Sequence, residues 1–513
     1  MKHMNRILAL ALALIMVLGL ATTAYAANIE IDDGAITGAT YEAYKLLNAE
    51  DLGAGKFDYT VNEAYRAALQ AIVGEDATDA EIIDYIKAQD TAEETRAFAD
   101  AIYAEIKNLD SDYTAEENLF TDVADGYYLI VETALGEEDD VHSLVMLDTA
   151  GQEKITVETK EEQPTSEKKV KDTNDTTGTD SEWQDSADYD IGDEVPFQIT
   201  FTLPGSYASY DEYFVGIHDV QAEGLDYVEG SLKVTVGGKD ITDWFDDTEE
   251  TDDDCTFHIE CADIVAKDKT DETVALKAGD TIVFEYKSIL TEDAKFGSTG
   301  NLNEMTVEFS NNPYGDGTSE TPKDTVIVFT YKVNVDKYAE AVEDGKELTG
   351  AGFTLYKEVP ADTEGALTGA EIKAEFAENI KAAALDDEAY YIVACEVKTD
   401  EDGDTFGFEG VDDGTYVLVE TTVPAGYNAW DAVEFEITAE HSLEGKVTNL
   451  EGGDLFAEDD TTGILDADII NNAGIELPST GGMGTTLFYA FGGLLMAAAV
   501  VMLVTKKRMA SAK

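Results

Sequence analysis

The sequence predicts a mainly β protein made of tandem immunoglobulin-like β-sandwich domains, with helical insertions in the first and last domains. The chain has 513 residues, and at roughly 150 residues per domain this length predicts about three domains. Hydrophobic residues make up 44% of the chain and include 25 Tyr and 20 Phe, enough to build packed cores. Short segments that alternate apolar and polar residues recur between turn residues, and this period of two is typical of half-buried strands.

The charge and the rare residue types exclude several classes of protein. Acids number 109 and bases 33, so the formal net charge is −76, which a nucleic-acid backbone would repel. The three Cys exclude a disulfide scaffold. Cys255 and Cys261 are near enough in sequence to form a local disulfide, and the alternative is that both stay free. The Cys and His residues show no spacing typical of a zinc site, and with only 5 His we expect no metal centre and no cofactor.

Residues 1–26 are typical of a secretory signal peptide. Lys2 and Arg6 form a basic start, residues 7–20 are almost wholly apolar, and residues 24–26 fit a small-x-small cleavage site. We therefore expect the rest of the chain to be exported.

The other end of the chain carries a pentapeptide, an apolar run and a basic tail, in that order. The pentapeptide is Leu477, Pro478, Ser479, Thr480 and Gly481. The apolar run, residues 483–504, is long enough to span a bilayer, and the basic residues 506–508 after it are expected to stay in the cytoplasm. A simple membrane anchor explains the run and the charges but leaves the pentapeptide unexplained.

This arrangement resembles the LPxTG cell-wall sorting signal of Gram-positive surface proteins. The resemblance implies that sortase, a membrane transpeptidase, cleaves between Thr480 and Gly481 and holds the Thr480 carbonyl as a thioester until an amine attacks it. The predicted parts of the chain are a signal peptide (1–26), a first domain (27–160), a middle domain (161–330), a third domain (331–476) and the sorting signal (477–513).

The first domain is expected to place strands around a helical insertion. Residues 29–31 alternate with acids as on a strand, and residues 126–132, 143–147 and 155–159 read as further strands. Phe98, Ile102 and Ile106 recur every four residues, so they share one face of a predicted helix.

The middle domain is expected to be a β-sandwich. Its polar start, 161–185, is predicted to be a linker that becomes a loop after Val170. Residues 196–204 alternate with period two between two prolines. The other predicted strands are 232–236, 281–286, 305–309 and 326–335.

The third domain repeats a phrase of the first. Its clearest strands are 348–356 and 414–421, and a helical insertion is expected near 372–384. The pattern G-x-Y-x-L-V-E recurs, offset by one residue, in 126–132 and 414–420, which indicates one strand type used in two related sandwiches.

The third domain also opens with Lys337 and closes with Asn471, each next to apolar strand residues, with Glu420 between them. A buried lysine favours its neutral form and a buried carboxyl favours its proton. Such an amine can attack the asparagine side chain while the acid moves protons, which expels ammonia and leaves an amide. Solvated polar residues are the ordinary alternative for an arbitrary trio of this kind.

The phrases L-x-G-A-x-F-x-L and G-x-Y-x-L-x-E-x-x-x-P-x-G-Y, followed by N-x-x-G just before the pentapeptide, resemble the Cna-B-type domain of SpaA-like, sortase-assembled backbone pilins. The resemblance implies an intramolecular isopeptide bond between Lys337 and Asn471, with Glu420 as proton shuttle. In the middle domain it implies a bond from Lys168 with Asp219 as shuttle. The partner is expected to be Asn303, with Asn301 and Asn311 as alternatives, and the adjacent Lys169 leaves the donor open.

The resemblance also implies a linking lysine at the end of the first domain. Lys160 occupies the place of the lysine in a V-Y-P-K-N-like phrase, of which only Val and Lys remain, and Lys154 is the alternative. The first domain has no Lys on its opening strand and no Asn on its last, so we expect no isopeptide bond there, although Glu132 matches Glu420 in phrase.

The function predicted by this resemblance is that of a structural backbone subunit of a covalent pilus, polymerised when the Thr480 carbonyl joins the Lys160 amine of the next subunit. Its expected partners are sortase, identical subunits, peptidoglycan or its precursor, and ancillary pilins, with no nucleic acid. Its expected location is the cell wall, after a transient stay in the membrane. We expect no enzymatic activity beyond single-turnover self-crosslinking. A monomeric, wall-anchored adhesin is the alternative.

Overall fold

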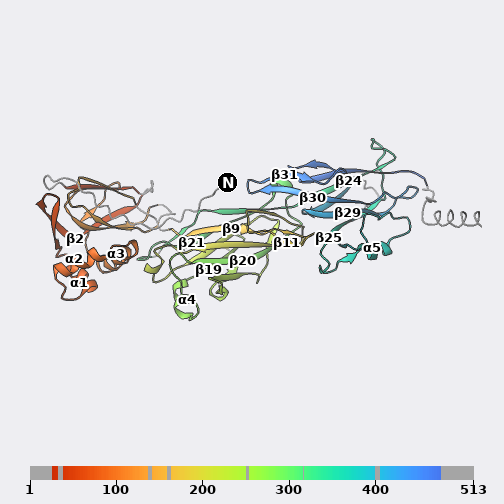
Figure 1. Cartoon of the computed structure of the whole chain (residues 1–513). Helices are drawn as coiled ribbons and strands as arrows, with labels where there is room; N and C mark the ends of the chain where they lie inside the picture. The colour runs from red at the N-terminus through yellow and green to blue at the C-terminus, as the bar shows by residue number, and fades with distance from the viewer. Residues whose placement is uncertain are drawn as a thin grey trace, which may run out of the picture.

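The structure is a computed structural model that describes residues 26–32, 38–136, 141–158, 163–249, 253–315, 317–398 and 405–474. Three groups of sheets follow one another along an elongated molecule (Figure 1). Strands dominate these residues and their five α-helices are short, which confirms the mainly β class. Residues 1–25 of the predicted signal peptide, Lys160 and the sorting signal lie outside the described residues.

The first domain packs two sheets, ordered β5-β1-β8 and β3-β2-β6-β7, against each other, and β4 pairs with β2. The opening strand β1 runs parallel to the closing strand β8. Its elements are β1 (Ala27–Asp32), β2 (Thr40–Gly53), β3 (Lys56–Val61), α1 (Arg66–Val73), α2 (Asp79–Ala88), α3 (Ala92–Ile106), β4 (Tyr113–Thr114), β5 (Leu119–Val123), β6 (Gly126–Ala134), β7 (Leu144–Asp148) and β8 (Lys154–Glu158).

The three helices of the first domain form the predicted insertion between β3 and β4. A capping box formed by Thr91 and Glu94 begins α3, because each side chain accepts a hydrogen bond from the backbone N–H of the other residue. Phe98, Ile102 and Ile106 are all buried in one core cluster, so the predicted helical face is confirmed.

The middle domain is a sandwich of two larger sheets, ordered β17-β16-β20-β13-β9 and β12-β23-β21-β14-β19-β18. On the interior strand β13, alternate side chains are buried, as period two requires. Its elements are β9 (Thr165–Val170), β10 (Thr173–Asn174), β11 (Thr179–Asp180), β12 (Ser186–Asp188), β13 (Glu194–Thr202), β14 (Val215–Gln221), β15 (Leu225–Tyr227), β16 (Lys233–Val236), β17 (Lys239–Asp240), β18 (Asp246–Thr248), β19 (Phe257–Cys261), α4 (Ile264–Thr270), β20 (Thr281–Leu290), β21 (Asn301–Ser310), β22 (Thr318–Glu320) and β23 (Asp324–Phe329), with three short 3-10 helices at Tyr207–Ser209, Thr242–Trp244 and Gly297–Thr299.

Two expectations for the middle domain were wrong. The apolar run 326–335, predicted as one strand, is split by Thr330 into β23 of the middle domain and β24 of the third domain, because its two halves join different sheets. The charged stretch after Val170, predicted as a loop, contains the β10–β11 hairpin and contacts the third domain, where Asn174 Nδ2 donates to Asp413 Oδ1 at 3.1 Å.

The third domain packs a sheet ordered β28-β24-β33-β32 against one ordered β26-β27-β25-β29-β30-β31. Its helix α5 is earlier and shorter than the predicted 372–384, because Phe376 is extended and turns its side chain to an apolar cluster on the sheet. The elements are β24 (Tyr331–Ala339), β25 (Gly352–Val359), β26 (Leu367–Thr368), α5 (Gly369–Glu375), β27 (Tyr390–Lys398), β28 (Thr405–Val411), β29 (Gly414–Thr422), β30 (Val433–Ser442), β31 (Lys446–Glu451), β32 (Ala457–Asp459) and β33 (Ile464–Asn471).

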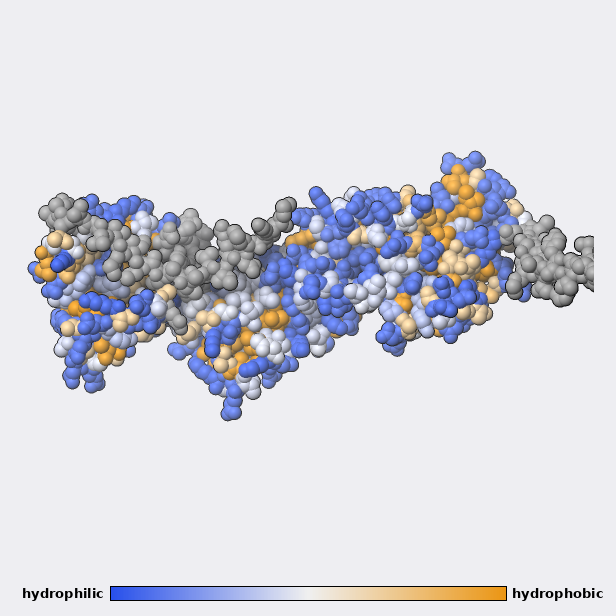
Figure 2. All heavy atoms as spheres, viewed as in Figure 1, coloured by the Kyte–Doolittle hydropathy of each residue, from blue (hydrophilic) through white to orange (hydrophobic). Residues whose placement is uncertain are grey.

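The surface reflects the composition. Hydrophilic residues cover most of the visible face, while apolar residues gather mainly over the third domain (Figure 2). Across the described ranges, no helix is both long enough and apolar enough to cross a membrane. The apolar run predicted to do so, 483–504, lies outside those ranges.

Candidate functional site

The core of the third domain brings one lysine, one asparagine and one glutamate into contact. Lys337 lies on β24 and Asn471 on β33, and these strands are parallel neighbours in one sheet. Glu420 comes from β29 in the facing sheet. Lys337 Nζ donates to Asn471 Oδ1 at 2.7 Å, and Asn471 Nδ2 donates to Glu420 Oε1 at 2.7 Å. The structure therefore assembles the trio expected from the sequence.

Burial lowers the pKa of the lysine in this trio. Lys337 is 1% exposed, and its Nζ lies 5.3 Å from the ring centroid of Phe353. Burial lowers the Lys337 pKa to about 8, against the opposing effect of Glu420, whose Oε1 lies 3.5 Å from Nζ. About one-tenth of such an amine is neutral at pH 7.

Glu420 is held in place by the backbone. Its Oε2 accepts a hydrogen bond from the Trp430 N–H at 2.7 Å, while Oε1 accepts from the Asn471 amide. The carboxyl therefore contacts the nitrogen that would leave as ammonia, and it is the nearest group that can relay a proton from the attacking amine to that nitrogen.

The middle domain assembles a second group around a hydroxyl. Lys168 Nζ contacts Asp219 and donates to Tyr286 Oη at 2.8 Å. Tyr286 donates to Asp219 Oδ2 at 2.7 Å and accepts from Asn303 Nδ2 at 3.0 Å. Lys168, Asp219 and Asn303 are all 0% exposed. Burial lowers the pKa of Lys168 and raises that of Asp219.

The geometry separates the candidates that the sequence left open. Lys169, next to Lys168, points outward and pairs with Asp185 at 2.6 Å. Asn301 is also buried, but its amide is bonded to Lys295 and Val328. The Asn311 amide donates to Thr318 O and Ser319 Oγ on β22. Of these candidates, the structure places only Lys168 and Asn303 on the shared hydroxyl.

Tyr286 is a residue of this site that sequence reasoning missed. It lies on β20 in the sheet that also contains β9, whereas Asp219 and Asn303 lie on β14 and β21 of the facing sheet. Period two on β20 indicates that Tyr286 faces inward. No pattern in the sequence places its hydroxyl beside Lys168, because that contact depends on how the two sheets pack.

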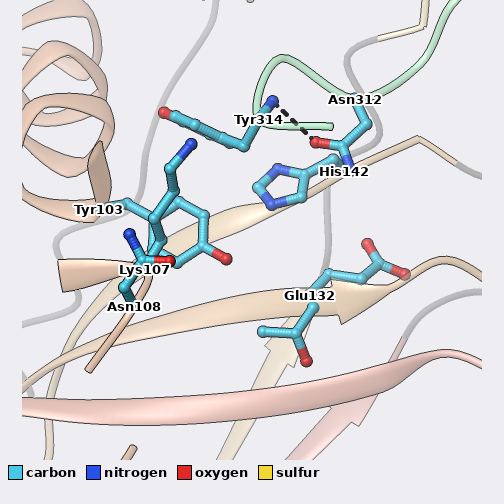
Figure 3. Close-up of a pocket in the computed structure, with 8 residues that line it drawn as sticks. Tyr103, Lys107, Asn108, Glu132, His142, Asn312 and Tyr314 are labelled. Atoms are coloured by element: carbon cyan, nitrogen blue, oxygen red, sulfur yellow. Dashed lines mark hydrogen bonds between the residues drawn. The ribbon is translucent and has the colours of Figure 1, made fainter. Parts of the chain in front are cut away.

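In the first domain the corresponding carboxyl has different neighbours. Glu132 on β6 is 2% exposed and its Oε2 accepts from Ser143 N at 3.2 Å and from Ser143 Oγ at 3.0 Å. It lines a pocket of about 310 Å³ with residues that include His142 and, from the middle domain, Tyr314 (Figure 3). A serine thus takes the place that Asn471 has beside Glu420.

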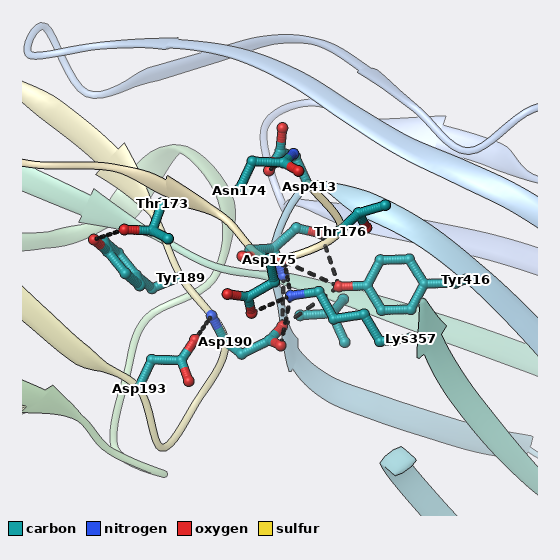
Figure 4. Close-up of polar contacts among 12 residues, drawn as sticks. Thr173, Asn174, Asp175, Thr176, Tyr189, Asp190, Asp193, Lys357, Asp413 and Tyr416 are labelled. Carbon is teal, nitrogen blue, oxygen red and sulfur yellow. Dashed lines mark hydrogen bonds and ion pairs between the residues drawn. The ribbon is translucent and has the colours of Figure 1, made fainter. Parts of the chain in front are cut away.

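A third buried lysine has different neighbours from Lys337 and Lys168. Lys357 on β25 is 0% exposed and lies where the third domain meets the middle domain (Figure 4). Its Nζ is 2.7 Å from both Asp175 and Asp190 and also contacts Asp412. These carboxylates raise the pKa of Lys357, so it is a cation that ties two domains together rather than a neutral nucleophile.

Of the two candidates for the linking lysine, the structure describes one. Lys160 lies outside the described residues. The alternative, Lys154, begins β8; its side chain is 66% exposed and its Nζ lies 2.5 Å from Glu30 Oε2.

Comparison with known proteins matches two segments of the chain to families. Residues 331–451 match the SpaA prealbumin-like fold domain, and residues 469–511 match the LPXTG cell wall anchor motif. These matches confirm the resemblance to sortase-assembled backbone pilins and the attachment of the chain to the cell wall at the surface.

One curated relative is the trypsin-resistant surface T6 protein of Streptococcus pyogenes, 25% identical over 371 residues. That alignment covers 62% of this chain and 65% of the relative, which is less than two thirds of its length. Similar solved structures include the major pilin SpaD of Corynebacterium diphtheriae (18% identity, 88% of this chain and 98% of that one, TM-score 0.49) and the T6 backbone pilin of Streptococcus pyogenes (16% identity, 89% and 100%, TM-score 0.48).

Proposed function

We propose that this chain, which carries a SpaA prealbumin-like domain and an LPXTG cell wall anchor motif, is the structural backbone subunit of a covalent cell-surface pilus. In this proposal sortase cleaves after Thr480 and joins the Thr480 carbonyl to the Lys160 amine of the next, identical subunit. Peptidoglycan or its precursor accepts the last subunit, and ancillary pilins share the fibre. The observation that carries the proposal is the presence, in a chain with this anchor, of two buried lysine–carboxyl–asparagine groups.

Each of these groups supports one self-crosslinking reaction. The neutral lysine amine attacks the asparagine Cγ, the C–N bond to the side-chain nitrogen breaks, and ammonia leaves. The attacking nitrogen gives up one proton, which Glu420 or Asp219 passes to the leaving nitrogen. The products are Lys337–Asn471 and Lys168–Asn303 amides. The carboxyl acts once on its own chain, so the protein has no enzymatic turnover and needs no cofactor.

The position of the crosslinks suits a protein under tension. In the third domain the bond would join the first and last strands, which are already parallel neighbours. In the middle domain it would join β9 of one sheet to β21 of the other. Tension that enters at Lys160 and leaves at Thr480 would pass through these bonds, and the strands between them would stay folded.

Substitution of the linking lysine tests the polymer. Lys160→Ala is expected to abolish SDS-resistant ladders in cell-wall extracts, because the thioester at Thr480 then has no subunit amine to accept it. Lys154→Ala, its neighbour six positions away, is the matched control and should leave the ladders intact. If only Lys154→Ala removes them, Lys154 is the linking residue. If the unsubstituted chain forms no ladder, the chain is a monomeric wall-anchored adhesin.

A further inference from the structure

The outer face of the middle domain gathers two histidines, a cysteine and an aspartate. Strands β14 and β19 are antiparallel neighbours, and their register places His218 directly opposite His258. The two rings lie 4.3 Å apart between centroids. Asp253 and Cys255 come from the segment just before β19. Because side chains alternate along β14, this group lies on the face opposite Asp219 and is separate from the crosslinking site.

The polar atoms of this group converge. His218 Nδ1 lies 3.7 Å from Cys255 Sγ and 3.5 Å from Asp253 Oδ2, and His258 Nε2 lies 3.2 Å from the same carboxylate oxygen. One ligand atom from each of the four residues lies within 4.8 Å of the other three. Zinc bonds of about 2.0–2.1 Å to nitrogen, about 2.0–2.2 Å to oxygen and about 2.3 Å to sulfur make the edges of a tetrahedron about 3.3–3.6 Å long. These three contacts match that spacing to within a few tenths of an ångström.

The other nitrogen of each ring also faces a carboxylate. His218 Nε2 lies 3.3 Å from Glu308 Oε2, and His258 Nδ1 lies 3.5 Å from Glu260 Oε1. In metal sites a carboxylate on the far ring nitrogen fixes the tautomer and orients the imidazole so that its inner nitrogen is free to bind the metal. Both histidines therefore have the setting of metal ligands.

We propose that His218, Asp253, Cys255 and His258 form a Zn²⁺ site on the outer face of the middle domain. Two imidazoles and a thiolate suit zinc, whereas Ca²⁺ and Mg²⁺ take oxygen ligands. The thiol gives its proton to solvent on binding, so the metal's two positive charges are balanced by one thiolate and one carboxylate. The histidine side chains are 18% and 13% exposed and that of Asp253 is 45% exposed, which leaves a path for entry.

Sequence reasoning missed this site because His218 on β14 lies 35 positions before Asp253, although Cys255 and His258 are only three positions apart. The expectation of no metal centre, which rested on the absence of a typical zinc spacing and on the small number of His, did not take this pairing of strands into account. The two cysteines considered for a disulfide are not bonded to each other: Cys261 is buried in the core, and Cys255 lies beside His218.

Metal titration of the exported chain, residues 27–480, tests the proposal with Zn²⁺ and Co²⁺ alone as probes. The reduced protein should bind one Zn²⁺ in competition with a chromophoric chelator, and bound Co²⁺ should show a thiolate-to-metal charge-transfer band. Cys255→Ser should remove that band and weaken binding at least tenfold, and His258→Asn should weaken it by a similar factor. Glu308→Gln, which alters no ligand, should weaken binding by about tenfold or more.

Cys395→Ser in the third domain is the matched control and should bind like the unsubstituted chain. Thermal unfolding without metal checks that each variant is folded. The proposal is overturned if the chain binds no Zn²⁺, if Cys255→Ser and Cys395→Ser bind it equally well, or if the Co²⁺ complex lacks a thiolate band.

Discussion

Replacing one carboxyl should remove one crosslink without disturbing the fold around it. Glu420→Gln keeps the size of the side chain. It also keeps an oxygen that can accept from the Trp430 N–H, which donates to Oε2 at 2.7 Å in the unsubstituted chain. It removes the group proposed to relay protons between Lys337 and Asn471. We therefore expect Lys337 and Asn471 to stay hydrogen-bonded but unlinked in the variant.

The magnitude follows from the size of the loop that the bond closes. Lys337 and Asn471 are 134 positions apart. Closing a loop of that size lowers the entropy of the unfolded chain by the equivalent of about 5 kcal/mol at 25 °C, if an amide acts as a disulfide does. The free energy of unfolding of the third domain should fall by about this amount in Glu420→Gln, and its denaturant midpoint should fall with it.

Intact mass of the exported chain, residues 27–480, is the decisive assay. Each isopeptide bond lowers the mass by about 17 Da, the mass of the ammonia that leaves. The unsubstituted chain should show two such losses and Glu420→Gln one. Glu132→Gln changes the carboxyl at the matching strand position of the first domain, which accepts from Ser143, and should keep both losses. An unshifted mass in the unsubstituted chain, or two losses in Glu420→Gln, would refute the reasoning.

Two further predictions concern the middle domain and pH. By intact mass, Asp219→Asn should show a single ammonia loss, whereas Lys169→Ala should show both. If Lys169→Ala shows only one loss, Lys169 is the lysine that forms the bond in the middle domain. Burial, with Arg96 nearby, lowers the pKa of His142 to about 3, below the roughly 6.5 of an unfolded histidine, so its contribution to stability is present above pH 6.5 and is lost as pH falls toward 3. Burial raises the pKa of Asp172, between the middle and third domains, to about 7, so its contribution is present below pH 4 and is lost as pH rises through 7. Calorimetric unfolding between pH 4 and 8 tests both expectations. As the pH falls, the contact between the first and middle domains should become less stable, and the contact between the middle and third domains should become more stable. Two transitions that shift in the same direction would contradict this.

The sequence by itself determined the local part of the candidate crosslinking site. Lys337 and Asn471 each stand next to apolar strand residues, which favoured burial, and a buried amine beside a buried acid has few chemical outcomes. The order of pentapeptide, apolar run and basic tail indicated the anchor because that signal is contiguous in the chain. The buried helical face of Phe98, Ile102 and Ile106 could be predicted for the same reason.

The tertiary structure alone decided which inward-facing residues meet. Asn301 and Asn303 lie two positions apart on β21 and are equally buried, so alternation cannot choose between them; the choice depends on how far along the facing sheet the Tyr286 hydroxyl lies. The pairing of His218 with His258 is a matter of strand register, and the contact of Lys357 with Asp175 joins two domains. Local patterns give the direction of a side chain, whereas its distance from residues on another strand or sheet depends on packing.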